Sequence, residues 1–435
     1  VKHVFGLIGS ATMEIFDALY DTKDIRFIGV RDERTGTHMA DGYARASGKV
    51  GVAMATSGPG ATNMVTGLAT AKLDSIPIVC ITGQVPRAAI GSDAFQEVDI
   101  YGTVLPVTKY SYLVMDIRDL ASTIKEAFVV ARSGRPGPVL IDIPKDIQNE
   151  TIEFVYPDEP VKLPGNNRPI RVSENQIEEA AHLINNAKKP VILAGHGILL
   201  SGASREIIQL AETASIPIGW TLLGAGSVPA SHPLNMGMMG MHGEFAVNNA
   251  IQDADLLIAC GMRFDDRVTG NVKAYSPNSK KIHIEIDPSE INKDVPVGVG
   301  IPCDLRTAMT QLLPHISRKQ NNEWIKTISG WQSESLERDI INVQTDKLYG
   351  AQVIRDIWKE TNGDALIVTD VGQHQMLEAQ YYDHEEPNTL LTSGGLGTMG
   401  YSLPAAIGAS FSRQNKDIWV IVGDGSIQMT ITELA

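Results

Sequence analysis

Cysteine is scarce in this chain, and its scarcity excludes two ways of stabilising a fold. Only three cysteines occur among 435 residues, and none has the Cys-x-x-Cys spacing of metal sites. Neither a disulfide framework nor a zinc site is therefore expected. Cys80 and Cys260 lie in the apolar runs IVCI and LIACG, which predicts inert, buried side chains. This usage favours a reducing compartment, the cytoplasm.

Long apolar runs and clusters of positive charge are also missing. No apolar run approaches the roughly 20 residues that a membrane-spanning helix needs, so we expect no membrane partner. The formal net charge is -14, and nucleic-acid binding requires gathered Lys and Arg side chains, so we expect no nucleic-acid partner. The chain begins with VKHVFG and ends with TELA, and we expect both ends to be cut.

Short apolar runs alternate with helix-like stretches, which predicts parallel strands covered on both faces. The chain is also too long for a single core. Breaks occur at 153–169, which is rich in Pro and Asn, and at the polar stretch 315–345. We predict an α/β fold with three doubly wound parallel-sheet domains in series, the last one truncated. Their predicted ranges are 1–150, 165–320 and 345–435.

A glycine turn at 423–426, GDGS, directly follows the apolar run DIWVIV. A strand, a tight turn and a helix start form a geometry that faces phosphate, and Asp424 can there ligate Mg²⁺ bound to a diphosphate. An ordinary Asp-Gly turn is the alternative interpretation of the same letters.

A second signal lies in the first third of the chain, where Glu33 follows the run IRFIGV. A lone glutamate at a strand end is usually a solvated surface residue. The small and apolar residues nearby, such as Gly36, Met39 and Gly42, instead favour a packed helix start. The run TSGPGATN at 56–63 predicts a glycine loop that opens a helix, either as a phosphate cradle or as a tight turn.

Together these stretches resemble the thiamine-diphosphate enzymes, and over essentially the whole chain they resemble the acetolactate synthases. The blocks that carry the resemblance are ADGYARASGKVGVAMATSGPGATN, DSIPIVCITGQVPRAAIGSDAFQE, GRPGPVLIDIPKDIQ, GMMGMHGEFAVNNA, RFDDRVTG, DVGQHQM, SGGLGTMGYSLPAAIGA and GDGSIQM. RFDDRVTG and GMMGMHG discriminate best, because related decarboxylases generally lack the RFDDRVTG run.

The resemblance implies a pyrimidine-binding domain, a central FAD-binding domain and a diphosphate-binding domain, in that order. It implies that the enzyme decarboxylates pyruvate on thiamine diphosphate and joins the remaining two-carbon unit to a second 2-keto acid. Glu33 is expected to hydrogen-bond the aminopyrimidine ring and drive proton removal, and Arg267 to bind the acceptor carboxylate. Gln96 and Lys145 are the other implied catalytic residues. Without the resemblance, a surface salt bridge of Arg267 with Asp265 or Asp266 is favoured.

The resemblance also implies three cofactors, thiamine diphosphate, Mg²⁺ and a structural FAD. For thiamine diphosphate and its metal the implied residues are Gln373, His374, Gly397, Thr398, Met399, Asp424, Gly425 and Ser426, with Asp424 as the metal ligand. For FAD they are Arg168, Gly195, Gly197, Thr221, Leu222, Gly240, Met241, His242, Gly261, Arg263, Asp265, Glu285, Ile286, Asp304, Gly394 and Gly395. An acid at the end of the IHIEI run is typical of dinucleotide sites at strand ends.

The chain departs from the family pattern at three places. Asp32 and Arg34 stand where the family has His and Gln, and Leu377 stands where it has Trp. The family's metal motif continues to an asparagine pair that lies beyond the last residue of this chain. The implied partners are small 2-keto acids, a second copy in a homodimer or tetramer whose active site lies at the subunit interface, and a small regulatory subunit.

Two alternatives stay open. One is another thiamine-diphosphate enzyme, such as glyoxylate carboligase, sulfoacetaldehyde acetyltransferase or pyruvate oxidase. The other is a non-catalytic protein that binds FAD and performs no chemistry.

Overall fold

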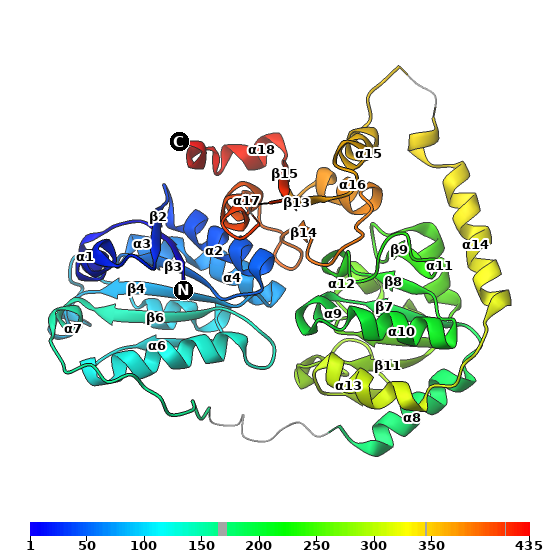
Figure 1. Cartoon of the computed structure of the whole chain (residues 1–435), viewed down its shortest axis with the longest axis horizontal. Coiled ribbons are helices and arrows are strands. Elements are labelled where there is room, and N and C mark those ends of the chain that lie inside the picture. The colour runs from blue at the N-terminus through cyan, green and yellow to red at the C-terminus, as the bar shows by residue number, and fades with distance from the viewer. Residues whose placement is uncertain (164–171, 344–345, 414) are drawn as a thin grey trace. The chain divides into compact units, whose positions relative to one another are not determined.

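The structure, a computed structural model, describes residues 1–163, 172–343, 346–413 and 415–435 (Figure 1). Residue contacts divide the chain into two compact units. Unit 1 comprises Val1–Asn167, Leu366–Gly372 and Leu391–Ala435, and unit 2 comprises Arg168–Ala365 and Gln373–Leu390.

Unit 1 contains a six-stranded sheet in the order β2-β1-β3-β4-β6-β5, and every neighbouring pair is parallel. Its strands are β1 (His3–Gly6), β2 (Arg26–Gly29), β3 (Gly51–Ala55), β4 (Ile78–Gln84), β5 (Tyr110–Leu113) and β6 (Val139–Pro144). The helices around it are α1 (Met13–Asp21), α2 (Glu33–Ser47), α3 (Pro59–Asn63), α4 (Val65–Asp74), α5 (Ile100–Val104), α6 (Ile117–Arg132) and α7 (Lys145–Asn149).

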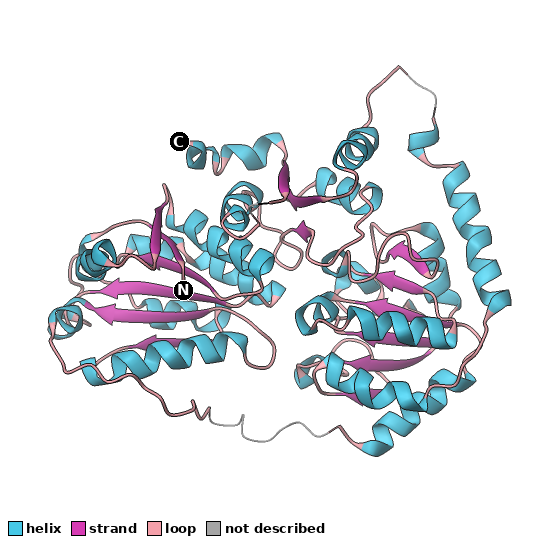
Figure 2. Ribbon diagram, in the orientation of Figure 1, coloured by secondary structure: helices cyan, strands magenta, loops and turns pink. Residues whose placement is uncertain are grey.

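Helices cover both faces of this sheet, as Figure 2 shows. Successive residues of a strand point to opposite faces, so each strand contributes to two cores. Cys80 and Leu140 join the core under α2 and α4, whereas Val79 and Ile141 join the core under α6. Burial on both faces explains why these strands have continuous apolar runs and no alternating pattern.

A small sheet completes unit 1, in the order β14-β13-β15, with all strands parallel. Its strands are β13 (Ala365–Thr369), β14 (Leu390–Leu391) and β15 (Asp417–Ile421), and the helices beside them are α17 (Ser402–Ser410) and α18 (Asp424–Gln428). Helix α17 packs closely on α2. A Cβ added at Gly42 would lie 2.0 Å from the Ala405 carbonyl oxygen, and one added at Gly408 would lie 1.9 Å from that of Met39. The two helices therefore approach through glycine, and no larger residue fits without moving them.

Unit 2 contains the second six-stranded sheet, in the order β12-β11-β10-β7-β8-β9, again with every pair parallel. Its strands are β7 (Pro190–Ala194), β8 (Ile218–Trp220), β9 (Asn235–Met238), β10 (Leu256–Cys260), β11 (Lys280–Ile284) and β12 (Val299–Ile301). Its helices are α8 (Glu174–Asn186), α9 (His196–Ser201), α10 (Ser204–Ala214), α11 (Phe245–Asp253), α12 (Asp266–Thr269), α13 (Leu305–Leu312), α14 (Asn322–Glu337), α15 (Gly350–Thr361) and α16 (Gln373–Tyr381).

The same two-faced packing holds in unit 2. Ile192 and Ile258 point into the core formed with α8, α10 and α13, whereas Leu193 and Ala259 point into the core formed with α11 and α14. The polar stretch at 315–345 includes α14, which buries Trp324 and Ile328. A stretch that is polar in composition therefore still forms a helix, because one face supplies enough apolar contact.

The predicted fold class is confirmed, since three parallel-sheet α/β arrangements follow one another and the third sheet is small. All three cysteines are free and buried, and burial raises the pKa of the Cys260 thiol to about 12. Inert cysteines are therefore confirmed. Among the described residues, no helix combines the length and apolarity that crossing a membrane requires.

Asp142 lies on β6, between β4 and the edge strand β5, and its carboxyl group is buried inside unit 1. It accepts hydrogen bonds from Thr82 Oγ1 at 2.7 Å and from Gln84 Nε2 at 2.9 Å. Burial raises the pKa of Asp142 to about 7, although both hydrogen bonds oppose the shift. Because this pKa is higher in the folded than in the unfolded state, the folded state binds more protons between about pH 4 and pH 7.

We predict that the free energy of unfolding falls as the pH rises from about 4 to 7, and that Asp142→Asn removes much of this fall. The asparagine keeps an oxygen that can accept one of the two hydrogen bonds and cannot ionise. Denaturant titrations at pH 5 and pH 7 measure the effect in wild type and variant. An identical pH dependence in the two proteins would contradict the assignment.

Candidate active site

The candidate catalytic residues of unit 1 gather at one edge of the first sheet. Glu33 follows β2, a glycine loop follows β3 and Lys145 follows β6. Because all six strands are parallel, the segments that follow them share the carboxyl edge, where open α/β sheets bind ligands. Strand order reverses between β1 and β3. At this point a Cβ on Gly9 would lie 2.3 Å from Thr56 Cβ, so the two loops touch.

Glu33 is the first residue of α2, and only 6% of its surface is exposed. Asn63 Nδ2 donates a hydrogen bond to Glu33 Oε2 at 3.0 Å. A Cβ at Gly60, the second residue of α3, would lie 2.9 Å from Glu33 Oε1, so the start of α3 lies close against the carboxylate. The packed helix start is confirmed, and the solvated surface position is excluded. A carboxylate at this end of a helix is also favoured by the helix dipole.

Asp32 and Arg34, which stand where the family has other residues, hold the first turn of α2 in place. Asp32 Oδ1 accepts a hydrogen bond from the Arg34 backbone nitrogen at 2.8 Å and so caps the helix. Arg34 Nη2 donates to the Met429 carbonyl oxygen at 2.9 Å, and Thr35 Oγ1 donates to Glu433 Oε1 at 2.6 Å. These residues are therefore used structurally, and they leave the Glu33 carboxylate in place.

Gln96 and Lys145 lie near the same edge. Gln96 has a φ of 61°. A Cβ at Gly58 would lie 2.7 Å from the Gln96 carbonyl oxygen, so Gln96 lies against the glycine loop. Lys145 Nζ donates to the carbonyl oxygen of Ser10, after β1, at 2.7 Å and lies 3.6 Å from Glu14 Oε1. The structure thus places both residues at the carboxyl edge, and their catalytic roles stay predictions.

The loop that carries Gly397, Thr398 and Met399 is held from two sides. Thr398 Oγ1 lies 2.8 Å from Thr70 Oγ1 of α4, and the Thr398 backbone nitrogen donates to Ser393 Oγ at 3.0 Å. Met399 is 43% exposed. A Cβ at Gly425 would lie 3.4 Å from Met399 Cε, so this loop and the GDGS turn come together.

The GDGS turn has the predicted geometry of strand, tight turn and helix start. It joins β15 to α18, which begins at Asp424. Asp424 is exposed, and its Oδ1 accepts a hydrogen bond from the Gly425 backbone nitrogen at 2.8 Å. Within the described ranges, no group of three or more His, Cys, Asp or Glu residues is placed to hold a metal ion. Mg²⁺ is usually held by one or two carboxylates together with phosphate and water oxygens, and Asp424 fits that limited role.

Sequence reasoning missed a buried aspartate that shapes this loop. Asp370 directly follows β13 and is fully buried. Its carboxylate accepts hydrogen bonds from the backbone nitrogens of Gly400 at 3.0 Å and Ser402 at 2.9 Å, and from Ser402 Oγ at 2.8 Å. The sequence could have indicated Asp370, because a polar residue directly after the apolar run ALIVT is typical of a site at a strand end.

A second missed group supports the same loop. Asp74 of α4 accepts hydrogen bonds from the backbone nitrogens of Gly395 at 2.6 Å and Gly394 at 3.2 Å, and it forms an ion pair with Arg45. Both glycines are predicted FAD contacts, and the structure gives their nitrogens a partner within the chain. The sequence near Asp74 could not predict its role, because its hydrogen-bond and ion-pair partners are distant in sequence.

In unit 2, the predicted FAD residues follow all six strands of the second sheet. They lie after β7 (Gly195, Gly197), after β8 (Thr221, Leu222), after β9 (Gly240, Met241, His242), after β10 (Gly261, Arg263, Asp265), after β11 (Glu285, Ile286) and after β12 (Asp304). Parallel strands bring these segments to one carboxyl edge. Gln373 and His374, also in unit 2, begin α16. Arg168 lies outside the described residues.

The switch point of this sheet lies between β7 and β10, where a nucleotide crevice is expected. A Cβ on Gly195 would lie 2.3 Å from the Gly261 carbonyl oxygen, and one on Gly197 would lie 2.6 Å from Gly261 Cα. The three glycines let the two loops meet here. Glu285, after β11, is buried and its Oε1 accepts a hydrogen bond from the Asp287 backbone nitrogen at 3.2 Å. The residues present therefore fit a dinucleotide at the strand ends.

Arg267 belongs to the loop after β10, and its side chain is 68% exposed. Asp265 caps α12 by accepting the Arg267 backbone nitrogen at 3.1 Å. The guanidinium lies 3.7 Å from Asp266 Oδ2 and 3.4 Å from Met241 Sδ. An exposed ion pair of this length holds the side chain only weakly, so Arg267 can turn toward a ligand.

Comparisons with known proteins agree with this architecture. Residues 1–103 match the thiamine pyrophosphate enzyme N-terminal TPP binding domain, residues 177–312 match the central domain of these enzymes, and residues 370–435 match their C-terminal TPP binding domain. The chain is 46% identical to the acetolactate synthase large subunit of Corynebacterium glutamicum, over 99% of the chain and 69% of that relative.

Other relatives span bacteria and plants. Identity is 42% to the acetolactate synthase isozyme 3 large subunit of Escherichia coli, over 100% of the chain and 77% of that relative. It is 45% to acetolactate synthase 1, chloroplastic, of Nicotiana tabacum, over 100% of the chain and 66% of that relative. With three matching enzyme domains and this identity along its whole length, the chain belongs to the acetolactate synthase large-subunit family of thiamine-diphosphate enzymes.

Proposed function

We propose that the protein decarboxylates pyruvate and transfers the remaining two-carbon unit to a second 2-keto acid, pyruvate or 2-ketobutyrate, in the biosynthesis of valine, leucine and isoleucine. Family membership supports the reaction, and the buried Glu33 supports catalysis over mere binding. A non-catalytic protein has no need to hold a carboxylate at a sheet edge with a glycine loop shaped around it.

Glu33 is proposed to exchange a proton with the aminopyrimidine nitrogen of the bound cofactor. Thiamine diphosphate supplies the electron sink that makes loss of CO₂ possible. Asn63 orients the carboxylate through its hydrogen bond to Oε2, and Oε1 faces Gly60. The oriented oxygen can therefore act at a fixed position, which general acid–base catalysis requires.

Arg267 is proposed to bind the carboxylate of the acceptor keto acid, because a guanidinium matches a carboxylate with two parallel hydrogen bonds. Gln96 and Lys145 are proposed to line the substrate path at the carboxyl edge of the first sheet. Met399 would contact the cofactor beside the GDGS turn, since its side chain reaches that turn.

Mg²⁺ and FAD are proposed as the further cofactors. Asp424 would ligate the metal beside the diphosphate, and Gly425 and Ser426 would present the start of α18 to phosphate oxygens. FAD would occupy the carboxyl edge of the second sheet, with a structural role. The glycine contacts between the loops after β7 and β10 support this placement.

The protein is further proposed to act in the cytoplasm as a homodimer or tetramer, with a small regulatory subunit. The relatives named as large subunits support a separate small subunit. In this arrangement, which the family resemblance implies, Glu33 of one copy would act together with Asp424 of another, so two chains would share one active site. The contacts of Arg34 with Met429 and of Thr35 with Glu433 would then support the site from within one chain.

Product analysis tests the proposed reaction against its rivals. With pyruvate as the only substrate, acetolactate should form together with CO₂. Acetyl phosphate with consumption of oxygen would instead indicate a pyruvate oxidase, and a requirement for glyoxylate or sulfoacetaldehyde would indicate the corresponding enzyme.

We predict that Glu33→Gln lowers kcat for acetolactate formation by roughly a hundredfold or more, because the amide keeps the shape but cannot accept the proton. Flavin content and melting temperature should stay near wild type. The exposed Glu153→Gln is the matched control and should retain full activity. Near-normal turnover by Glu33→Gln would refute the role of this carboxylate.

We predict that Arg267→Ala reduces acetolactate yield by about tenfold while CO₂ release from the first pyruvate falls less, because only the acceptor meets this guanidinium and the untransferred two-carbon unit can be protonated and leave as acetaldehyde. Both products are measured in the same assay. Arg338→Ala, which removes an exposed arginine of the same unit, serves as control. Equal losses of the two products would assign Arg267 another role.

A mixture of inactive variants tests the shared site. Glu33→Gln and Asp424→Ala chains, each inactive alone, should regain up to about a quarter of wild-type activity when unfolded and reassembled together, because one site in such a dimer carries both native residues. Mass spectrometry confirms that mixed dimers form. If mixed dimers form and no activity returns, Glu33 and Asp424 act from the same chain.

A further inference from the structure

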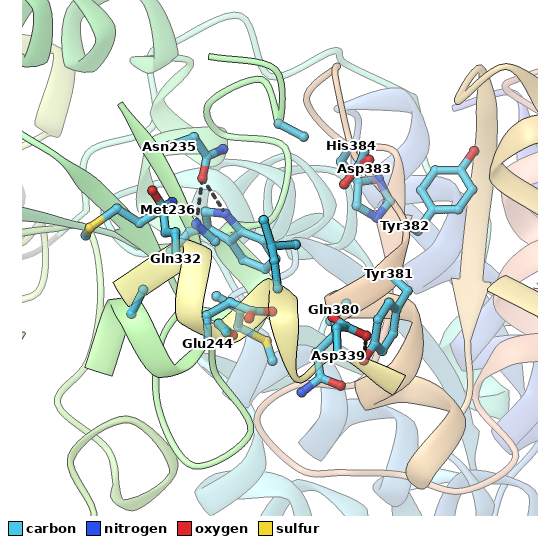
Figure 3. A pocket seen from close by; sticks show the side chains of 18 of the residues that line it. Asn235, Met236, Glu244, Gln332, Asp339, Gln380, Tyr381, Tyr382, Asp383 and His384 are labelled. Carbon is cyan, nitrogen blue, oxygen red and sulfur yellow. Dashed lines mark hydrogen bonds between the residues drawn. The ribbon is translucent and has the colours of Figure 1, made fainter. Parts of the chain in front are cut away.

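Unit 2 contains a cavity of about 500 Å³ that none of the proposed catalytic or cofactor contacts lines (Figure 3). It lies beside β9, the edge strand of the second sheet. The remaining walls come from residues of the segment 226–230, the start of α11, the second half of α14, the following turn at 339–341, Arg355 of α15, and the end of α16 with residues 382–384 after it. Its volume falls in the range of small-molecule sites in proteins.

The walls of this cavity combine an apolar surface with uncompensated negative charge. Trp220, Met236 and Met238 supply apolar and aromatic surface from the sheet side. Of the described residues that line the cavity, Arg355 is the only Lys or Arg, and its Nη1 lies 2.5 Å from Asp383 Oδ2, so this pair is neutral. Among the described residues, no cation forms an ion pair with Glu244 or Asp339, and Arg355 acts on Glu244 only from a distance.

The Glu244 carboxylate has neither a hydrogen-bond donor nor a paired cation among the described residues. Glu244 precedes α11 and is half-buried. Burial raises the pKa of Glu244, Asp339 raises it further, and Arg355 opposes the shift. A carboxylate in such a place is destabilised when ionised, unless a cation binds beside it.

Asp339 is held in a fixed orientation. Its Oδ1 accepts hydrogen bonds from the Ile341 backbone nitrogen at 3.0 Å and from Tyr381 Oη at 3.1 Å. Its Oδ2 has no protein donor among the described residues, and Figure 3 shows the Tyr381 ring beside it. A second oriented acceptor therefore faces the same space as Glu244.

A metal ion would leave the apolar part of these walls without a partner, and within the described residues no three His, Cys, Asp or Glu side chains are grouped to complete its coordination. An organic cation does match. Its charged group would meet Glu244 and Asp339, and its apolar body would lie against Trp220 and the two methionines, with aromatic rings also favouring positive charge. We propose that this cavity is a binding site for a small organic monocation with an apolar body, separate from the catalytic and flavin sites.

Binding of benzylammonium to the whole enzyme, with its cofactors and keto-acid substrate present, tests this proposal. Benzyl alcohol and benzoate are the neutral and anionic probes of similar size. Calorimetry and ligand-observed NMR should show benzylammonium binding with a millimolar Kd, at least fivefold tighter than benzyl alcohol, and no binding of benzoate.

Glu244→Gln should weaken benzylammonium binding by roughly five- to tenfold and leave benzyl alcohol binding unchanged. Glu334→Gln is the matched control, because Glu334 lies on α14 but pairs with Arg338 and does not line the cavity. Equal weakening by both variants, or equal affinity for benzylammonium and benzyl alcohol, would overturn the proposal. Absence of any binding to the whole enzyme would overturn it too, since the cavity would then be filled by the protein itself.

Discussion

A buried ion-pair network holds unit 1 together at the place where its chemistry is expected. Arg45 Nε lies 2.6 Å from Asp41 Oδ1, and its Nη2 lies 2.7 Å from Asp74 Oδ2, with both carboxylates fully buried. Tyr401 Oη donates to Asp41 at 2.7 Å, and the backbone nitrogens at 394–395 donate to Asp74. Losing one partner would leave a buried charge uncompensated, at a cost of about 3–5 kcal/mol. The network therefore ties α2, which begins with Glu33, to the loop that leads to Met399.

Parallel sheets do the rest of the positioning in both units. Each strand ends at the same edge as its neighbours. Strand pairing alone therefore brings together loops that are far apart in sequence. The two sheets use this edge differently. In unit 1, the start of α3 meets the Glu33 carboxylate at Gly60. In unit 2, Gly195 and Gly261 close on each other and shape the crevice expected for a dinucleotide.

Much of this architecture could be predicted from the sequence, and the omissions have a physical cause. Central strands such as β4 and β10 are buried on both faces, so they appear as continuous apolar runs. The edge strands β5 and β9 are only partly buried and short, and their residues YSYL and NMGM give no such run. Glu33 could be found from the small residues that follow it. The sequence could not show that Asp74 and Asp370 both bind the loop at 394–402, because only the tertiary fold brings that loop close to them.

The division of unit 1 between the two ends of the chain constrains the order of folding. Helix α2 is synthesised early, but the helix that covers it, α17, follows more than 350 residues later. Contacts of such sequence separation carry a large loop-closure cost and form late. Until then the face of α2 around Gly42 stays open, while residues 168–365 have time to fold. The middle of the chain can thus fold before unit 1 is complete, and until α17 is synthesised the nascent protein exposes a small, glycine-lined face of α2.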